Sequence, residues 1–353
     1  MKHSVLLISN HASESCNPGQ IDALRLMRQR GEIDGLDVIH AGVAKGESDS
    51  QRSARVARHI ASSGADVIIV LSMKDLVRDM DAVGRALQRR PVLYWEGDPW
   101  GRGKRVSEQM AAWLEMSSEV FSVGGHPQAG LLMRHGARKV HHTIHTYDHV
   151  LFGSAEQGIC PDPTVDVAFL GTNASRMPVL SGLPGSFQRW LLVSGLLRTY
   201  GKRCKIAGRG WPAVISHGEV PFDRQHEFIQ SARVLSNWDH YPKTASYVSD
   251  RLAVAMISGR VQVTTRHPDM HFLPGRDRGL FLEPTVSDVL RRTRALTARP
   301  DQELLELGMR AHRWAKQRIS HRQAMRHMLS VAIPGIERPP GDPWDLLPGP
   351  WRT

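Results

Sequence analysis

The feature that most constrains the fold of this chain is a regular alternation of short apolar runs with amphipathic segments. The clearest apolar run, 66–72 (DVIIVLS), is continuous, rich in β-branched residues and uncharged after its first residue. From Lys74 onward, apolar residues recur at helical spacing as far as Leu87. Continuous apolar strands separated by amphipathic helices indicate parallel sheets that helices cover on both faces.

The alternation runs through the first half of the chain and restarts after a break rich in glycine and proline. In the first half we expect strands at 5–9, 36–40, 66–72, 92–95 and 119–123, with helices at 21–30, 50–63, 74–90 and 106–116. In the second half we expect strands at 165–170, 203–207, from 234, 261–265 and 279–282, with helices at 188–200, 247–257, from 286 and from 302. We therefore predict an N-terminal domain over 1–152, a linker over 153–164, a C-terminal domain over 165–332 and a Pro- and Trp-rich tail over 333–353.

Length, cysteine count and charge set the broad class. A chain of 353 residues suits two domains, and its apolar runs are far shorter than the ~18 residues of a membrane span. The three cysteines, Cys16, Cys160 and Cys204, lie too far apart for a disulfide framework, so we expect a cytoplasmic protein. The net charge of +11 attracts polyanions without choosing among nucleic acid, membrane and phosphorylated small molecules.

Several chemical motifs fail on inspection. The segment 97–104 resembles a phosphate loop but has one residue too many between its glycines, and Arg105 stands where Ser or Thr would hold magnesium. The segment 208–213 satisfies a relaxed GxGxxA, although its Trp-Pro pair is bulky for a pyrophosphate site. The histidines at 141, 142, 145 and 149 alternate with residues typical of extended chain and lack the usual carboxylate or cysteine partners, so we expect no metal site.

A set of segments from residue 136 onward carries a family resemblance. They are 136–140 (GARKV), 147–152 (YDHVLF), 167–173 (VAFLGTN), 206–211 (IAGRGW), 250–259, 261–264 (VQVT), 280–284 (LFLEP) and 307–311 (LGMRA). Together they resemble the GT-B glycosyltransferases, most closely the CgeB-like group named after a spore-maturation protein. The resemblance covers about residues 130–330, and residues 1–130 agree only in layout.

The resemblance implies an α/β fold of GT-B architecture, with two Rossmann-like parallel-sheet domains facing a cleft. It also implies a glycosyltransferase that moves a sugar from a nucleotide-sugar donor to a small-molecule or glycan acceptor, without a metal or other cofactor. On this resemblance the expected donor-binding residues are Gly171, Thr172, Asn173, Arg209, Gly210, Trp211, Tyr241, Lys243, Asp250 and Arg251.

The chemistry of the donor agrees with these residue types. Negative charge grows on the diphosphate as the glycosidic bond breaks, so the site needs cations and backbone N–H groups there. Arg251 at the start of a helix is the expected catalytic cation, and Trp211 and Tyr241 are expected to stack on a base or sugar. Many relatives place a glutamate that bonds the ribose three residues after this arginine, whereas this chain has Val254. Ribose recognition must then differ, the donor is unusual, or the chain is an inactive member.

The first half offers an acceptor site. The segment 94–101 (YWEGDPWG) gathers carboxylates, aromatics and glycines at the carboxyl end of an expected strand, where open α/β sheets bind ligands. We predict Asp98 as the base that takes the proton of the acceptor hydroxyl. Trp95 and Glu96 are expected beside it, with His11 and His126 as reserve bases.

Two other functions remain open on the sequence. A nucleotide-sugar epimerase or pseudo-glycosyltransferase would use the same donor pocket and need no acceptor. A basic nucleic-acid-binding protein would fit the net charge, but no RRM, KH or helix-turn-helix signature is present and aromatics do not alternate with basic residues, so a nucleic-acid partner is disfavoured. The sequence does not specify the sugar, the nucleotide, the acceptor, the retained or inverted configuration, or the oligomeric state.

Overall fold

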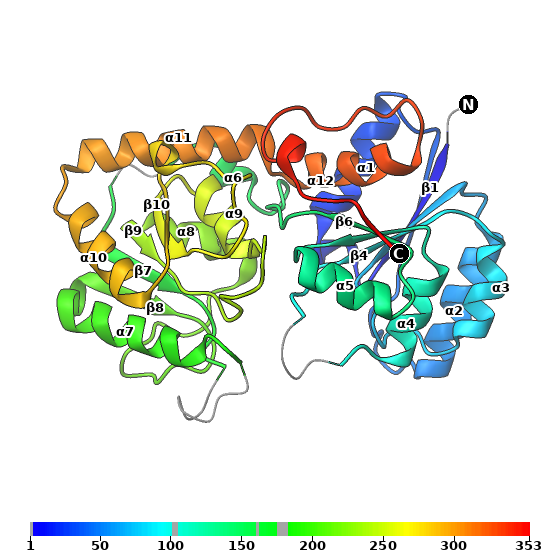
Figure 1. The fold of residues 1–353 in the computed structure, drawn as a ribbon, viewed down its shortest axis with the longest axis horizontal. Helices are drawn as coiled ribbons and strands as arrows, with labels where there is room; N and C mark the ends of the chain where they lie inside the picture. Colours follow the sequence, from blue (N-terminus) through cyan, green and yellow to red (C-terminus); the bar gives the residue numbers. More distant parts are fainter. Residues whose placement is uncertain (1–2, 101–104, 160–161, 175–182) are drawn as a thin grey trace. The chain divides into compact units, whose positions relative to one another are not determined.

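The computed structural model describes residues 3–100, 105–159, 162–174 and 183–353 (Figure 1). Within these residues the chain forms two compact units. The first unit comprises the described residues of Met1–Trp100, Lys104–Ile144 and His321–Thr353, and the second comprises those of His145–Ser320. The chain therefore returns to the first unit at its C-terminal end, whereas the sequence pattern assigned residues up to 332 to the second domain.

The first unit is built on one sheet in the order β12-β6-β5-β4-β3-β1-β2. All neighbouring strands are parallel except β12, which pairs antiparallel with β6. The strands are β1 (Ser4–Ser9), β2 (Gly35–His40), β3 (Val67–Leu71), β4 (Val92–Glu96), β5 (Glu119–Ser122), β6 (Lys139–His142) and β12 (Trp351–Arg352). The helices are α1 (Pro18–Gln29), α2 (Asp49–Ser62), α3 (Met80–Leu87), α4 (Glu108–Met116), α5 (His126–Arg134) and α12 (His321–Ala332), with 3-10 turns at Glu14–Cys16 and Trp344–Leu346.

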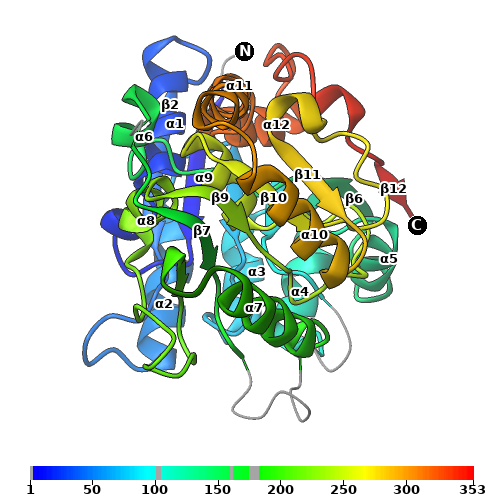
Figure 2. The same cartoon turned by 90° about the vertical axis from the view of Figure 1, so that its left-hand side faces the viewer.

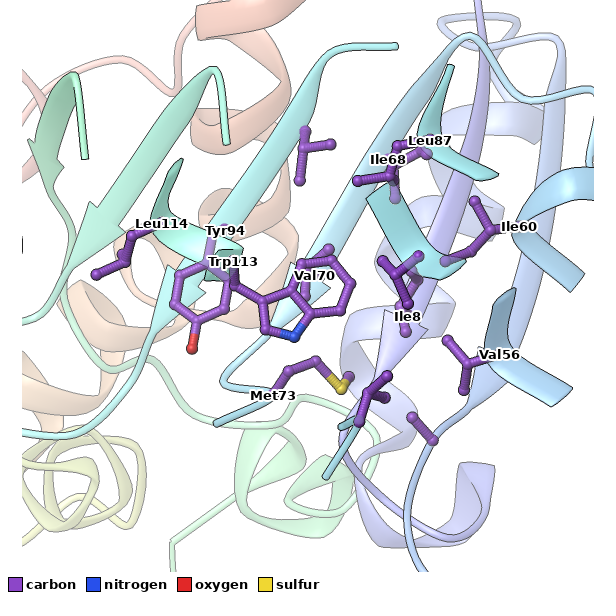
Figure 3. Packing of buried hydrophobic residues seen from close by; sticks show 14 of the residues in the cluster. Ile8, Val56, Ile60, Ile68, Val70, Met73, Leu87, Tyr94, Trp113 and Leu114 are labelled. Atoms are coloured by element: carbon purple, nitrogen blue, oxygen red, sulfur yellow. The ribbon is translucent and has the colours of Figure 1, made fainter. Parts of the chain in front are cut away.

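One apolar cluster joins this sheet to the helices from α2 to α5. Figure 3 shows Tyr94 and Trp113 among aliphatic side chains of the cluster, including Ile8, Ile68 and Val70. Because side chains alternate across a strand, the intervening residues of β1 and β3 lie on the other face of the sheet. Burial on both faces explains why these strands read as continuous apolar runs.

Helix α3 begins later than its sequence pattern predicts. The helix starts at Met80, and the side chain of Asp79 caps it by accepting a hydrogen bond from the backbone N–H of Ala82 at 3.0 Å. Lys74 therefore lies in the loop after β3 and not in a helix. Ser72 and Lys74 both have positive φ, 36° and 43°, so this loop turns sharply as it leaves the sheet.

The second unit has a five-stranded parallel sheet in the order β11-β10-β9-β7-β8 (Figure 2). Its strands are β7 (Val165–Leu170), β8 (Cys204–Ala207), β9 (Ala232–Ser236), β10 (Val261–Thr265) and β11 (Leu280–Glu283). Its helices are α6 (Gly153–Gln157), α7 (Ser186–Tyr200), α8 (Gln225–Gln230), α9 (Asp250–Ile257), α10 (Val286–Thr297) and α11 (Asp301–Arg318), with 3-10 turns at Gly201–Arg203, Phe222–Arg224 and Arg276–Arg278. The expected linker thus contains a helix, α6, and residues 160 and 161 lie outside the described residues.

Helix α11 packs against the amino ends of β10 and β11. A Cβ on Gly308 of α11 would lie 2.1 Å from the carbonyl oxygen of Gly259, two residues before β10. The ring of His312 also contacts the carbonyl of Ile257, Nδ1 to O, at 2.8 Å. Helix α11 therefore does not cover the carboxyl ends of these strands, where loops follow.

The C-terminal tail closes the edge of the first sheet. Trp351 pairs with Val140 of β6, and the side chain of Trp344 is fully buried beside His327. The Pro- and Trp-rich tail is therefore part of the first unit's interior and sheet. Among the described helices, none has both the length and the apolar character that crossing a bilayer requires.

Candidate functional site

The loops at the carboxyl ends of β7 and β8 are joined into one structure. The backbone N–H of Asn173 donates to the carbonyl of Arg209 at 2.8 Å, and the Asn173 side-chain amide donates to the carbonyl of Gly210 at 3.2 Å. The indole N–H of Trp211 donates to the carbonyl of Gly171 at 2.7 Å. The structure therefore brings together these predicted donor residues, which come from two separate segments of the sequence.

Glycine is required where the two loops meet. Gly210 has φ of +85°, and a Cβ there would lie 2.2 Å from the carbonyl oxygen of Asn173. Gly208 has φ of +127°, and its Cβ would lie 2.3 Å from the carbonyl oxygen of Gly171. A side chain at either position would separate the loops, because the left-handed backbone and the close approach both exclude a Cβ.

Arg189, a buried residue of α7, joins the loop after β9 to the loop after β7. The sequence analysis did not single it out. Arg189 of α7 donates from Nη1 to the carbonyl of Thr172 at 2.8 Å and from Nε to the carbonyl of Trp238. The same Nη1 lies 2.7 Å from Nε2 of His240. Burial, and then the charge of Arg251, lower the pKa of Arg189 to about 9. One side chain therefore joins the loops after β7 and β9, and it adds a second positive charge near Arg251.

A carboxylate balances part of this charge. Oδ2 of Asp239 lies 2.8 Å from Nε2 of His267, whose Nδ1 lies 3.1 Å from the carbonyl of Thr244. Burial acts to raise the pKa of Asp239, but the hydrogen bond to His267 and the charges of Arg189 and Arg251 outweigh it, so the pKa is lowered. Burial and the same two arginines lower the pKa of His240 to about 3, which keeps this imidazole neutral.

Arg251 lies in this electrostatic cluster, at the second residue of α9. Its side chain is a quarter exposed, and its Nη1 is 3.7 Å from Oδ1 of Asp250. Burial acts to lower the pKa of Arg251, and the charges of Asp250 and Asp239 more than offset this, so the guanidinium keeps its charge. Asp250 and Arg251, both expected in the donor site, therefore lie at the carboxyl end of the sheet, near Arg189.

Other expected donor residues differ in their surroundings. Trp211 is buried against Phe169, with ring centroids 5.6 Å apart, so its indole is committed to the core and the expected stacking on a ligand has no support. Arg209 and Lys243 are exposed, and Tyr241 is partly buried in the loop before α9. Val254 is buried in α9, so no polar contact to a ribose comes from this position.

The sequence did carry a signal for Arg189. In α7 the buried residues include Arg189, Leu192, Val193 and Leu196, which follow helical spacing. A charged residue in an otherwise apolar helical stripe must find polar partners inside the protein. His240 and Asp239 carried no comparable pattern, because they lie in a loop whose path depends on the tertiary fold.

In the first unit, the carboxyl ends of β3 and β4 hold a second polar cluster. Asp98 forms an ion pair with Lys74, and both side chains are partly exposed. Glu96 is fully buried, accepts from the hydroxyl of Tyr94 at 3.3 Å and accepts from the backbone N–H of Asp98 at 2.8 Å. Gln128 of α5 completes the cluster by donating to the carbonyl of Asp98 at 2.9 Å.

The two carboxylates have different environments. Burial raises the pKa of Glu96 to about 7, although the charge of Lys74 acts in the opposite direction. Burial acts to lower the pKa of Lys74, and the charges of Glu96 and Asp98 reverse this, so Lys74 stays protonated. Asp98 is thus the carboxylate that reaches solvent. Glu96, which is buried, positions the backbone of Asp98.

The remaining acceptor-side residues lie at or near the carboxyl ends of other strands of the same sheet. Trp95 is buried at the end of β4, and Gly101 at the end of its motif lies outside the described residues. His11 follows β1, where burial and then the nearby charge of His40 lower its pKa. His126 is exposed at the start of α5 and its ring contacts Trp351 edge-on, with centroids 6.2 Å apart.

The described part of the chain offers no cluster of three or more His, Cys, Asp or Glu side chains that could hold a metal. Of the histidines between 141 and 149, His141 pairs with Glu119 instead, Nε2 to Oε2, at 2.6 Å. Lys139 donates to the other oxygen of that carboxylate at 3.0 Å.

Comparison with known proteins connects the second unit to a family. Residues 188–330 match a family described as glycosyl transferase-like, a span that includes Arg189, Asp239 and Arg251. None of the curated proteins compared with the sequence matches it. The matched span is less than half of the chain, and it specifies neither a donor nor an acceptor.

Solved structures resemble the whole chain at low sequence identity. An alpha-glucosyltransferase in complex with UDP and a 13-mer DNA aligns with a TM-score of 0.64 and 8% identity, covering 94% of this chain and 99% of that one. HepE of Anabaena in complex with UDP and glucose aligns with a TM-score of 0.57 and 12% identity, covering 93% and 99%. A putative UDP-N-acetylglucosamine 2-epimerase from Listeria monocytogenes aligns with a TM-score of 0.53 and 12% identity, covering 96% and 99%. These matches confirm the expected GT-B fold with two parallel-sheet domains.

Proposed function

We propose that this GT-B glycosyltransferase binds a nucleoside diphosphate sugar, with UDP the favoured nucleotide, at the carboxyl end of the second sheet. The observation that carries the proposal is a pair of neighbouring cations, the buried Arg189 and the partly exposed Arg251, which Asp239 balances only in part. An anion bound there relieves the repulsion that lowers the pKa of Arg189. A diphosphate carries the charge that such a site favours.

The backbone of the site supplies the remaining recognition. In the first turn of α9 the backbone N–H of Arg251 donates to Oδ1 of Asp250 at 2.9 Å, and that of Leu252 donates to the carbonyl of Ser249 at 3.0 Å. The helix therefore contributes its dipole, and the guanidinium of Arg251 makes the direct contact. The joined loops after β7 and β8 present Thr172 and Asn173 beside the guanidinium of Arg189. Arg209 and Lys243, both exposed, would contact the donor from the outside.

The chemical step follows from this arrangement. The bond from the anomeric carbon of the sugar to the terminal phosphate oxygen breaks, and its electron pair leaves with the nucleoside diphosphate. Arg251 stabilises that charge as it forms, which is the task that a metal ion performs in other sites. The acceptor hydroxyl oxygen forms the new bond to the anomeric carbon, and its proton passes to a base or to the departing phosphate.

We assign the acceptor to the first unit. Asp98 forms an ion pair with Lys74, and its backbone N–H donates to Glu96, so its carboxylate is positioned to accept the proton of a hydroxyl. This role makes Asp98 a base in an inverting enzyme and an orienting contact in a retaining one. His11 and His126 remain reserve bases.

Finer assignments belong to the same proposal. Membership of the CgeB-like group rests on the motifs from 136 to 311, and a cytoplasmic location rests on the wide spacing of the cysteines. Cys160 lies outside the described residues. Burial raises the pKa of the Cys204 thiol to about 12, which makes it an inert core residue.

The proposal is tested by thermal denaturation with nucleoside diphosphates. UDP should raise the melting temperature in EDTA as much as in magnesium, because ligands of the native state stabilise it and cations of the protein replace the metal. Arg251→Ala should weaken UDP binding by roughly 1.5–3 kcal/mol, the worth of a lost charge-assisted hydrogen bond, and should weaken uridine binding much less. Equal losses for UDP and uridine would show that the variant damages the fold, and no stabilisation by any nucleoside diphosphate would refute the donor site.

One alternative keeps the donor site and changes the reaction. The resemblance to a putative epimerase favours testing whether UDP-sugars react without an acceptor. Release of UDP that depends on an added acceptor supports transfer. Isomerisation of the sugar without an acceptor supports epimerisation.

A further inference from the structure

A cavity lined by arginines lies in the second unit, away from the proposed donor site. Its volume is about 310 Å³, and its lining residues are Asp277, Arg278, Arg310, Arg313, Trp314, Gln317 and Arg318. Four arginines face one aspartate there. The volume is at the lower end of the range for sites that hold small ligands.

The cavity lies at the amino ends of the strands of the second sheet, and the donor loops lie at their carboxyl ends. Arg278 belongs to the 3-10 turn that directly precedes β11, and the other arginines belong to α11, which packs against the amino ends of β10 and β11. Arg251 and the loops after β7 and β8 are at the carboxyl ends. The arginine cavity is therefore no extension of the donor site.

Ordinary helix electrostatics explains only part of the cluster. Cations in the last turn of a helix interact favourably with its dipole, and this accounts for Arg318. Arg310 and Arg313 lie one to two turns earlier, where that effect has faded, and Arg278 comes from another element. Asp277 lies 3.8 Å from Arg278, Oδ2 to Nε, and the side chains of Arg310 and Arg313 form no ion pair or hydrogen bond with the described residues. The lining therefore carries an excess of positive charge.

The arginines surround a buried aromatic side chain. Trp314, which is 5% exposed, forms part of the cavity wall. Guanidinium groups bind phosphate oxygens through paired hydrogen bonds, and several of them match a doubly charged group better than a carboxylate.

We infer that this cavity is a second ligand site that binds a phosphate group, carried either by a small soluble molecule or by a lipid headgroup. The ligand enters between the 3-10 turn at 276–278 and α11, with Arg310 and Arg313 as its main contacts. Neither catalysis nor donor binding depends on it, because no residue of the donor site lines the cavity.

The test uses the full chain and inorganic phosphate at constant ionic strength. Phosphate should raise the melting temperature of the wild type, and Arg310→Gln/Arg313→Gln should weaken the apparent affinity at least tenfold. Glutamine forms helices well, so the double variant should keep the wild-type melting temperature without phosphate. Arg310→Lys/Arg313→Lys, which keeps the charge but loses the paired geometry, should give an intermediate affinity.

Two controls separate this site from bulk charge and from the donor site. Arg198→Gln/Lys202→Gln removes the same amount of charge close to β8, and β8 and β11 are the two outermost strands of the sheet, on opposite sides. This control variant should leave the phosphate response unchanged. Inorganic phosphate can also occupy the donor site, so the part of the response that Arg310→Gln/Arg313→Gln removes should persist in Arg251→Ala, while Arg310→Gln/Arg313→Gln should keep the response to UDP. A phosphate response that follows Arg251 instead would overturn the proposal.

Vesicles distinguish the two sources of phosphate. Sedimentation with phosphatidic acid vesicles, but not with phosphatidylcholine vesicles, assigns a headgroup if it requires Arg310 and Arg313. A thermal response to inorganic phosphate without sedimentation assigns a soluble ligand. If neither response depends on these two arginines, the cavity binds no phosphate and the inference is wrong.

Discussion

Glu96 is a carboxyl group that the fold keeps away from water. Its two oxygens contact the Tyr94 hydroxyl and the Asp98 backbone N–H, and its pKa is raised to about 7. In the unfolded chain the same group has a pKa near its ordinary value of 4.5. The folded state therefore binds a proton that the unfolded state has already released between these two values.

This difference predicts how stability depends on pH. A raised carboxyl pKa contributes stability below about pH 4.5, and that contribution is lost as pH rises through about 7. The loss is on the order of 3 kcal/mol. Glu96→Gln, which keeps the acceptor for the Asp98 N–H, should flatten the stability profile between pH 5 and 8 in urea titrations. Glu115→Gln, an exposed change in the same unit, should keep the wild-type slope, and an unchanged slope in Glu96→Gln would contradict the assignment.

Asp98 carries the sharpest prediction about the reaction. Asp98→Asn should leave UDP binding intact and lower turnover by roughly 10²–10⁴-fold if the carboxylate is the general base. A drop of only a few-fold is the result for a retaining enzyme in which Asp98 orients the acceptor. Lys74→Gln breaks the same ion pair while keeping the carboxylate, so an equal loss of turnover in both variants at equal stability would reduce Asp98 to a structural partner of Lys74.

At the scale of elements, the donor site depends on how closely the loops after β7 and β8 approach. Gly210→Ala should destabilise the protein by ~1–3 kcal/mol and weaken UDP binding, because the new methyl group must displace the Asn173 carbonyl. Gly218 is the matched control, since its φ of +82° nearly equals the +85° of Gly210 and no atom lies within 4 Å of its Cβ position. Urea titration and UDP calorimetry on both variants separate the backbone strain from the clash. Equal effects would show that the loops can move apart.

The elements also show what a sequence pattern can and cannot predict. Strands β1 and β3 were predictable because burial on both faces leaves continuous apolar runs. The start of α3 was not, since the apolar spacing extends back past the cap at Asp79 into the loop that carries Lys74. The glycines before Trp211 led us to expect a contact with the ligand. The ring packs against Phe169 instead, a contact that depends on the tertiary fold.

At the scale of the molecule, the described part of the chain passes between its two units at Ile144/His145 and at Ser320/His321. The sequence pattern indicated the first passage approximately, through its glycine- and proline-rich break. It missed the second, because α11 and α12 both have amphipathic helical patterns and only a short interval separates them. Helix α12 packs on α1, a contact between residues some three hundred positions apart that no local pattern encodes.

The C-terminal return should therefore stabilise the first unit without shaping the donor site. Trp344 is fully buried against His327, so Trp344→Ala should lower stability by ~3–5 kcal/mol, as expected for a large cavity in a packed interior. Leu346→Ala, at an exposed position of the same turn, should have a small effect. Both variants should bind UDP with wild-type affinity in calorimetry below the melting temperature, because every residue assigned to the donor lies in the second unit. A weaker affinity for UDP in Trp344→Ala alone would show that the donor site depends on the tail, and the assignment of donor binding to the second unit by itself would then be wrong.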